Sequence, residues 1–197
     1  MIKFLYNLFV LPKLLTDIFW NWMLLKVTNT QYKSFPKING KIVIRGRGLI
    51  KFGYGVKVTS SLSANPVGLS IKSCFYVMPE AIIIIGNNVG ISNCLLFAKK
   101  SIIIEENVMI GGGCQIFDTD FHSLSYEERV IKKDNNIQTD PVLIKKGAFI
   151  GASSIILKGV TVGERSIVAA GSVVTKSIPD DEIWGGNPAK FIKKLSS

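Results

Sequence analysis

The sequence predicts an all-β fold made of short parallel strands stacked into coils. Divided every six residues from Ile144, the chain reads IKKGAF, IGASSI, ILKGVT, VGERSI, VAAGSV, VTKSIP. The first position is always a β-branched aliphatic residue, and the fifth is mostly small. A short fixed period of this kind indicates a parallel β-helix of hexapeptide repeats. An amphipathic helix would need a period of about 3.6 residues, which this region lacks.

The same frame occurs earlier, at residues 85–96 and 104–121, and more loosely at 52–63. The aliphatic side chain of each repeat points into a prism, and the small residue relieves crowding near a corner. Three hexapeptides close one triangular coil, and the coils stack by parallel strand pairing, which buries the aliphatic rows on one another. The sequence therefore predicts a β-helix over residues 37–179 and a C-terminal tail over residues 180–197 that packs on it.

An apolar segment precedes the repeats. Pro12, Lys13 and Asp17 interrupt it, and its longest run without a charge, Phe4–Leu11, is too short to span a bilayer. No small-residue cleavage site follows, so a secretory signal is not expected. We expect one or two short helices within residues 1–36. Residues 1–28 of this segment either lie in a membrane interface or pack on the domain or a neighbouring subunit.

The net charge of +10, from 24 basic and 14 acidic residues, predicts an anionic partner such as a membrane face or a phosphorylated cofactor. No nucleic-acid partner is expected, because the basic residues are scattered and form no long run. Three cysteines without a C-x-x-C pair favour a reducing compartment, and hence a cytoplasmic location. A single histidine argues against a zinc site, and no metal is expected.

The repeat frame is lost after Phe121 and resumes at about Ile144. The intervening segment is polar and charged, and it is predicted to be an extended loop over residues 122–141. Repeat proteins accept such insertions at coil corners, and functional residues favour loops whose ends are held rigidly. His122, the one histidine of the chain, stands at the start of this loop. Histidine is suited to proton transfer near neutral pH, although a lone histidine is often an ordinary surface residue.

The chain resembles the left-handed parallel β-helix acyltransferases over about residues 40–195. Within that family it is most similar to the O-acetyltransferases of sugars and bacterial polysaccharides, including the galactoside and maltose enzymes. The segments that carry the resemblance are IIIIGNNVGISN, IEENVMIGGGCQIFDTDFHSL, IGASSIILKGVTVGERSIVAAGSVVTKSIP and IWGGNPAKFIKKL. The resemblance implies a left-handed coil, a homotrimer with active sites between neighbouring prisms, and acetyl-CoA as acyl donor.

In that family the catalytic histidine lies at the start of an extended loop, a position that His122 matches. A neutral imidazole can take the proton of a sugar hydroxyl as it attacks the thioester, and a backbone N–H can stabilise the oxyanion. Asp118 or Asp120 could orient the imidazole, as the carboxylate of a catalytic triad does. Asp120 could instead bind sugar hydroxyls, and either carboxylate could satisfy backbone groups at the corner.

The resemblance also assigns binding residues. Asn93, with Ser92, matches a position that holds the acceptor, although an asparagine here could equally serve a turn with positive φ. Ala152 and Ala170 match positions that contact the pantetheine arm, although coil stacking also requires small residues. Phe149 stands where many relatives carry tryptophan.

Four residues match the family's phosphate-binding positions: Thr175, Lys176, Lys190 and Lys193. Lysine is an adequate phosphate partner, although it lacks the two-pronged geometry of arginine. The alternative is a C-terminal tail with solvated lysines, which fits Lys193 better than Lys176.

Together these observations predict an acetyl-CoA-dependent O-acetyltransferase acting on a sugar of a cell-envelope glycan or its precursor. The apolar N-terminus favours a place at the inner face of the membrane. Three alternatives stay open: an N-acetyltransferase acting on an amino-sugar nucleotide, a xenobiotic acetyltransferase acting on an antibiotic, and a non-enzymatic β-helix scaffold.

Overall fold

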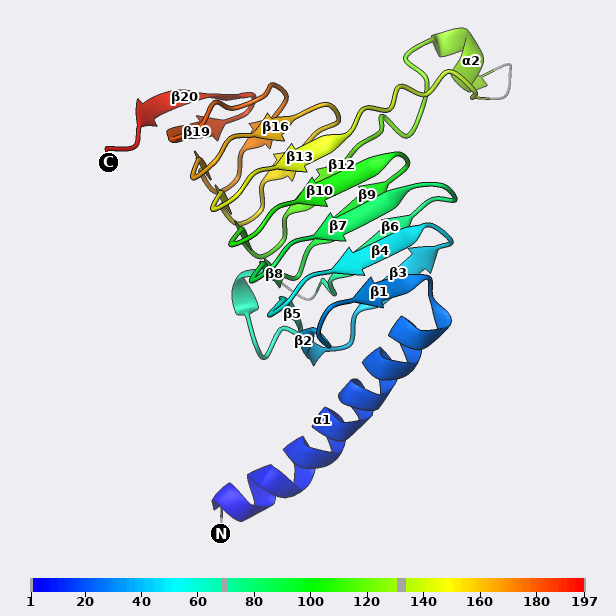
Figure 1. Ribbon diagram of the computed structural model, residues 1–197, viewed down its shortest axis with the longest axis vertical. Helices are drawn as coiled ribbons and strands as arrows, with labels where there is room; N and C mark the ends of the chain where they lie inside the picture. The colour runs from blue at the N-terminus through cyan, green and yellow to red at the C-terminus, as the bar shows by residue number, and fades with distance from the viewer. Residues whose placement is uncertain (1, 69–70, 131–133, 197) are drawn as a thin grey trace.

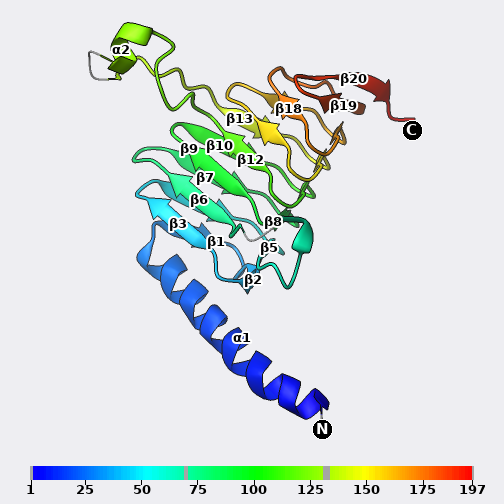
Figure 2. The same ribbon diagram turned by 180° about the vertical axis from the view of Figure 1, so that it is seen from behind.

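The computed structural model describes residues 2–68, 71–130 and 134–196, and for residues 2–11 the helical backbone alone. The chain forms a triangular prism whose three walls are β-sheets, here named A, B and C (Figure 1). Each coil runs from sheet A through B to C before the next coil begins. A helix projects from one end of the prism, and a long loop leaves its side (Figure 2).

Sheet A has six parallel strands: β1 (Thr30–Tyr32), β4 (Leu49–Phe52), β7 (Ile82–Ile85), β10 (Ser101–Ile104), β13 (Val142–Ile144) and β16 (Thr161–Val162). Sheet B has eight strands: β2 (Lys37–Gly40), β5 (Lys57–Ser60), β8 (Gly90–Ser92), β11 (Met109–Ile110), β14 (Phe149–Ile150), β17 (Ile167–Val168), β19 (Glu182–Gly186) and β20 (Ala189–Lys194). Sheet C has six parallel strands: β3 (Val43–Gly46), β6 (Cys74–Val77), β9 (Leu95–Ala98), β12 (Gln115–Phe117), β15 (Ile155–Ile156) and β18 (Val173–Val174).

The two repeat positions behave as the sequence predicts. Residues at the first position are fully buried and stack strand on strand, as in the register pair Ile150 and Val168. Residues at the fifth position are also buried, because they lie inside the corners. There the hydroxyl groups of Ser154 and Ser172 donate hydrogen bonds to the Ala169 carbonyl oxygen, at 3.0 and 2.6 Å. Small polar residues therefore fit the corner and satisfy its backbone.

The β-helix extends beyond its expected limits at both ends. Its first strand, β1, pairs with β4 and begins at Thr30, before the predicted boundary at residue 37. At the other end, β19 joins sheet B beside β17, and β20 folds back antiparallel on β19. The C-terminal tail is therefore a β-hairpin that continues sheet B.

The N-terminal segment forms one helix, α1 (Ile2–Val27), and the expectation of one or two short helices is wrong. The helix continues through Pro12, although proline removes one backbone hydrogen bond. Its C-terminal half closes the open end of the prism through the buried side chains of Asn21 and Leu25. The Asn21 amide donates to the Gly40 carbonyl oxygen at 2.8 Å, and its oxygen accepts from the Ile42 N–H at 3.1 Å.

Toward its N-terminus α1 points away from the prism (Figure 1). Between residues 12 and 27 the helix also exposes large apolar side chains, including Leu14, Leu15, Ile18 and Phe19. The alternative of packing on the domain is therefore observed for Asn21 and Leu25, whereas the membrane alternative stays a prediction. Within the described ranges, no helix is both long and apolar enough to cross a membrane.

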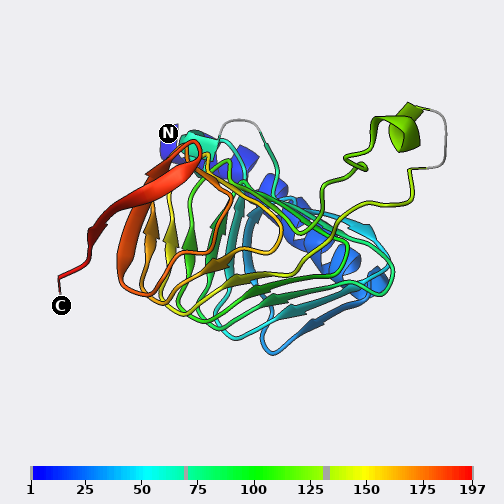
Figure 3. The same ribbon diagram turned by 90° about the horizontal axis from the view of Figure 1, so that it is seen from above.

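The extended loop leaves after β12 and returns at β13 (Figure 3). It carries a short helix, α2 (Tyr126–Val130), and its two ends are joined by an antiparallel bridge between Thr119 and Thr139. The loop starts where sheet C turns into sheet A, which we call the C–A corner. The turn from sheet B into sheet C, which contains Asn93, Ala152 and Ala170, is the B–C corner.

Candidate active site

An aromatic cluster holds the start of the extended loop. Tyr76 and Phe97 stack on the outer face of sheet C, with ring centroids 4.7 Å apart. The Phe121 ring meets Phe97 at 4.8 Å and Phe117 at 5.1 Å, in both cases edge to face. Phe121 has a φ of 66°, which is unusual for a bulky residue. These contacts fix the backbone immediately before His122.

His122 is paired with a carboxylate from the far side of the loop. Its Nδ1 lies 2.6 Å from Oδ2 of Asp134, and the Ser123 N–H donates to the other oxygen of Asp134 at 2.6 Å. The hydrogen bond from Ser123 is the main cause that lowers the pKa of Asp134, and the bond from His122 adds to it. Arg129 of α2 donates to the Ser123 carbonyl oxygen at 2.6 Å and so ties the loop together.

This pairing leaves the imidazole open on one side. A neutral ring that donates Nδ1–H to Asp134 presents an unprotonated Nε2, and the His122 side chain is 75% exposed. The arrangement of a base whose second nitrogen is held by a carboxylate is the one found in catalytic triads. Sequence analysis missed Asp134, because no fixed spacing links it to His122.

The two acidic residues that precede His122 have other partners. Asp118 is fully buried, and its oxygens accept hydrogen bonds from the backbone N–H groups of Lys99 and Lys100, both at 2.7 Å. Burial raises the pKa of Asp118, while these hydrogen bonds lower it. The expectation that Asp118 orients the imidazole is therefore wrong, and the alternative role at the corner backbone is the one observed.

Asp120 forms an ion pair with Lys158 at 2.8 Å, and among the described residues its second oxygen is buried without a hydrogen-bond partner. It does not take the orienting role either, because the carboxylate on His122 is that of Asp134.

Asn93 and Ser92 hold a neighbouring loop in place. Asn93 is fully buried with a φ of 48°, and its amide donates to the Ile71 carbonyl oxygen at 2.6 Å. The Ser92 hydroxyl accepts from the Asn65 amide at 2.6 Å. Asn93 thus has the second of its two expected roles, that of a turn residue with positive φ. Its buried side chain does not face an acceptor sugar.

Ala152 and Ala170 stack at the B–C corner. The Gly171 N–H donates to the Ala152 carbonyl oxygen at 2.8 Å. A Cβ atom at Gly111 would lie 2.6 Å from the backbone nitrogen of Ala152, and one at Gly151 would lie 2.5 Å from that of Ala170. Close stacking therefore requires glycine at positions 111 and 151, which lie against these two alanines.

The candidate phosphate-binding residues are exposed and divided between two places. Thr175 and Lys176 follow β18 at the C–A corner, on the same edge as the extended loop. Lys190 and Lys193 lie on β20, where Lys190 pairs with Gly185 beside the B–C corner. One chain consequently does not bring His122 together with Ala152, Ala170 and Lys190, because the width of sheet C separates the two corners.

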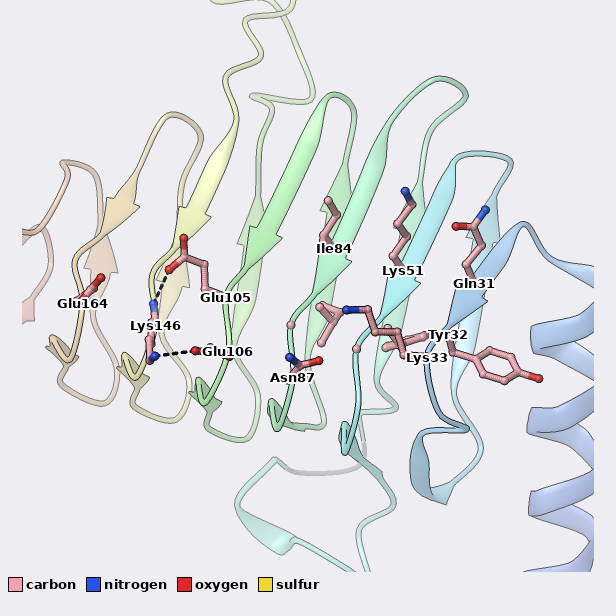
Figure 4. A pocket seen from close by; sticks show the side chains of 14 residues that line it. Gln31, Tyr32, Lys33, Lys51, Ile84, Asn87, Glu105, Glu106, Lys146 and Glu164 are labelled. Atoms are coloured by element: carbon pink, nitrogen blue, oxygen red, sulfur yellow. Dashed lines mark hydrogen bonds and ion pairs between the residues drawn. The ribbon is translucent and has the colours of Figure 1, made fainter.

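A hollow of about 740 Å³ lies on sheet A and the turns that follow it (Figure 4). Lys146 within it forms an ion pair with Glu106 at 2.6 Å, and its backbone N–H donates to Glu105 at 2.8 Å. His122 is not among its lining residues. Because Lys146, Glu105 and Glu106 are paired with one another and His122 lies elsewhere, the loop around His122 remains the better candidate. No cluster of three or more metal-ligating side chains occurs in the described part of the chain.

Comparison with known proteins identifies the repeats. The family model for the hexapeptide repeat of succinyl-transferase matches residues 141–176, which include strands of all three walls. Over these repeats the chain is similar to the hexapeptide-repeat acyltransferases. The predicted resemblance and fold class are thus confirmed: a left-handed parallel β-helix with a helical N-terminal segment and an extended loop.

Two curated relatives of this hexapeptide-repeat protein come from yeasts. A protein of Schizosaccharomyces pombe, named as a predicted acetyltransferase, is 38% identical over 106 residues, covering 53% of this chain and 49% of the relative. A protein of Saccharomyces cerevisiae with the same description is 32% identical over 127 residues, covering 64% of this chain and 63% of the relative. The matched part is thus about half to two thirds of the length of each relative.

Solved structures of hexapeptide-repeat proteins share the fold at low identity. An N-acyltransferase of Bacillus cereus in complex with dTDP and coenzyme A is 23% identical, with a TM-score of 0.69 over 88% of this chain and 89% of that one. The polySia specific acetyltransferase NeuO is 21% identical, with a TM-score of 0.59 over 85% of this chain and 83% of that one. A hexapeptide-repeat acetyltransferase of Vibrio cholerae in complex with acetyl coenzyme A is 24% identical, with a TM-score of 0.56 over 88% of this chain and 74% of that one.

Proposed function

We propose that the chain is an acetyl-CoA-dependent O-acetyltransferase that acetylates a sugar hydroxyl of a cell-envelope glycan or its precursor. The pairing of His122 with Asp134 at 2.6 Å is the observation that carries this proposal. It leaves an exposed, oriented nitrogen at the position where the family resemblance expects a general base. The acetyltransferases among the relatives and similar structures support the same reaction class.

In the proposed reaction, Nε2 of His122 removes the proton of the acceptor hydroxyl as its oxygen attacks the thioester carbonyl carbon. The tetrahedral intermediate then expels the coenzyme A thiolate, which takes the proton back from the imidazolium. Asp134 keeps the ring in the required tautomer and stabilises its positive charge. A backbone N–H stabilises the oxyanion, and no covalent enzyme intermediate forms.

The separation of the two corners supports a site shared between chains. Ala152 and Ala170 line the pantetheine arm, and Lys176, Lys190 and Lys193, with Thr175, bind the phosphates of acetyl-CoA. Because sheet C keeps His122 away from the B–C corner of its own chain, His122 would act beside that corner of a neighbouring prism. We therefore propose a homotrimer, in which each of three symmetric interfaces forms one site.

We place the enzyme at the cytoplasmic face of a membrane, where α1 lies in the interface. The exposed apolar side chains of Leu15, Phe19 and Trp22 suit the boundary between headgroups and hydrocarbon, and the basic net charge suits anionic lipids.

One alternative has an observation of its own. The similar N-acyltransferase of Bacillus cereus was solved with dTDP, which favours an amino-sugar nucleotide as a second candidate acceptor. The exposed imidazole of His122 would serve an amine as well as a hydroxyl, since either nucleophile must lose a proton.

Both candidate acceptors can be tested by measuring coenzyme A release from acetyl-CoA. The acceptors offered are pairs of sugars that differ only in a hydroxyl or an amino group, each free and nucleotide-linked. Wild-type protein should acetylate the hydroxyl series, and His122→Ala should lower kcat by about 10² to 10⁴-fold. Tyr126→Ala, an exposed position in the same loop, is the control and should retain turnover. Near wild-type kcat in His122→Ala would remove the proposed base, and activity restricted to amino sugars would select the second candidate.

A further inference from the structure

Two hollows meet beneath α1 at the end of the prism opposite β20. The first, of about 580 Å³, has a lining that includes Lys13, Lys41, Lys72, Ser60, Ser61 and Ser63. The second, of about 430 Å³, is mainly apolar, and its lining includes Leu15, Phe19, Trp20 and Met23. Thr16 and Lys41 line both hollows, so the two are neighbours on the surface.

The first hollow is basic. Asp17 is the one carboxylate among its described lining residues, against three lysines. Asp17 is already engaged, since its Oδ1 lies 3.8 Å from Nζ of Lys41. Lys13 and Lys72 are exposed and add two further positive charges at its rim. Lysines beside serine hydroxyls form an environment that suits a phosphate group, which accepts charge-assisted hydrogen bonds.

The second hollow is an apolar groove along α1. The side chains of Leu15 and Phe19 are 58% and 63% exposed, and Trp20 is 41% exposed. Nζ of Lys41 lies 5.7 Å from the centroid of the Trp20 ring, so one cation stands between the apolar groove and the basic hollow. Exposed apolar surface of this kind usually marks an interaction site.

We infer that the two hollows together bind a phosphorylated membrane lipid. The headgroup phosphate occupies the basic hollow between Lys13, Lys41 and Lys72, and the start of the hydrocarbon chain lies along Leu15 and Phe19. The charge and the apolar surface are complementary to the two ends of such an amphiphile, and neither end alone accounts for both hollows. The inference rests on the membrane location in the proposed function and does not depend on acetyl transfer.

The lipid site also sets the distance from the membrane to the candidate active site. His122 follows the fourth coil, three coils above β1. At a strand spacing of about 4.8 Å, three coils amount to about 15 Å. With the prism axis perpendicular to the membrane, an acceptor sugar on a lipid would have to stand clear of the headgroups to reach His122, which favours a sugar beyond the one attached directly to the lipid.

Vesicle sedimentation tests the site with the full-length chain. Phosphatidylcholine vesicles containing phosphatidic acid should bind the wild-type protein, whereas pure phosphatidylcholine should not. Lys13→Ala with Lys72→Ala should weaken binding about 25-fold, because each basic residue near an anionic surface contributes about 5-fold. The control is Lys51→Ala with Lys100→Ala, which removes two exposed lysines elsewhere on the prism and should change binding little.

The apolar groove has a separate variant. Leu15→Ser with Phe19→Ser should reduce binding to the same vesicles and leave thermal unfolding unchanged, since both side chains are exposed. Inorganic phosphate at equal concentration should compete weakly, because it lacks the chain. Strong competition would assign the basic hollow to a free anion instead.

Several outcomes would overturn the inference. Equal losses in the two lysine pairs would mean that net charge alone drives binding. Lower oligomeric mass in the serine variant would mean that a second copy of the chain covers the groove. Acetyl transfer by the same wild-type preparation, measured without vesicles, distinguishes the lipid site from the proposed function. Turnover without vesicle binding would contradict the lipid site. Vesicle binding without turnover would contradict the proposed function.

Discussion

Asp134 Oδ2 accepts the Nδ1–H of His122 at 2.6 Å across twelve residues of the extended loop. Asp134→Asn keeps the shape of the side chain but removes its charge and can select the wrong tautomer. We expect kcat to fall by between about 10-fold and the 10⁴-fold seen in a buried triad, because the His122 pair is more exposed. The KM for acetyl-CoA should change little. Glu127→Gln, an exposed carboxylate on α2, is the control, and an equal effect there would remove the positioning role of Asp134.

The contact between His122 and Asp134 should be stable except in acid. The pKa of Asp134 is lowered, first by the Ser123 N–H and then by His122. A carboxyl group whose pKa is lower in the folded state stabilises that state at pH values above its unfolded-state pKa of about 3.9. This stabilisation is lost as the pH falls through the folded-state pKa. Nitrogen NMR shifts of the single histidine should therefore show Nδ1–H bonding down to about pH 4. Loss of this signature between neutral pH and about pH 5 would contradict the pairing.

The aromatic contacts of Phe121 should position His122. Phe121→Ala removes edge-to-face contacts with Phe97 and Phe117, which contribute about 0.5 to 1.5 kcal/mol each. Because small displacements of a catalytic group are costly, we expect kcat to fall by about 10- to 100-fold. Leu124→Ala, at a position in the same loop that is 77% exposed, should retain activity. Unchanged kcat in Phe121→Ala would show that the loop is held by other contacts.

Asn21 should be essential to the closed end of the prism. Asn21→Leu removes the hydrogen-bond partner of the buried Gly40 carbonyl oxygen and that of the Ile42 N–H. Leaving these two buried polar groups unsatisfied costs about 2 to 6 kcal/mol. Urea unfolding at fixed protein concentration measures the loss. Asn29→Ala, an exposed neighbour at the end of α1, should change stability little. If Asn21→Leu proves as stable as the wild type, α1 is held mainly by Leu25 and its surroundings.

Mixing two impaired variants tests the shared site. His122→Ala damages the C–A corner, and Lys190→Ala damages the region beside the B–C corner. If each site combines these regions from different chains, unfolding and refolding the two variants together should restore part of the activity through mixed trimers. Light scattering should give about three times 21.7 kDa for the wild type. A fully active monomer, or no recovery on mixing, would place the whole site within one chain.

The sequence by itself determined the β-helix. The rows at Ile150, Val168 and their equivalents repeat with a fixed period, so each local pattern specifies the same buried position in the next coil. It also determined where the extended loop leaves, because an insertion interrupts the period and the period then resumes. The position of His122 follows from that interruption.

Only the tertiary structure decided the partners of the site. Asp134 reaches His122 because the loop folds back on itself, and Asp118 is drawn away by the N–H groups of Lys99 and Lys100. Asn21 closes the prism through backbone groups that belong to a different element. Such contacts join residues with no fixed spacing along the chain, and they depend on which buried polar groups lack a partner once the coils have stacked. The repeat pattern in the sequence predicts how the coils stack, whereas these hydrogen-bonded pairs form only after the coils have stacked.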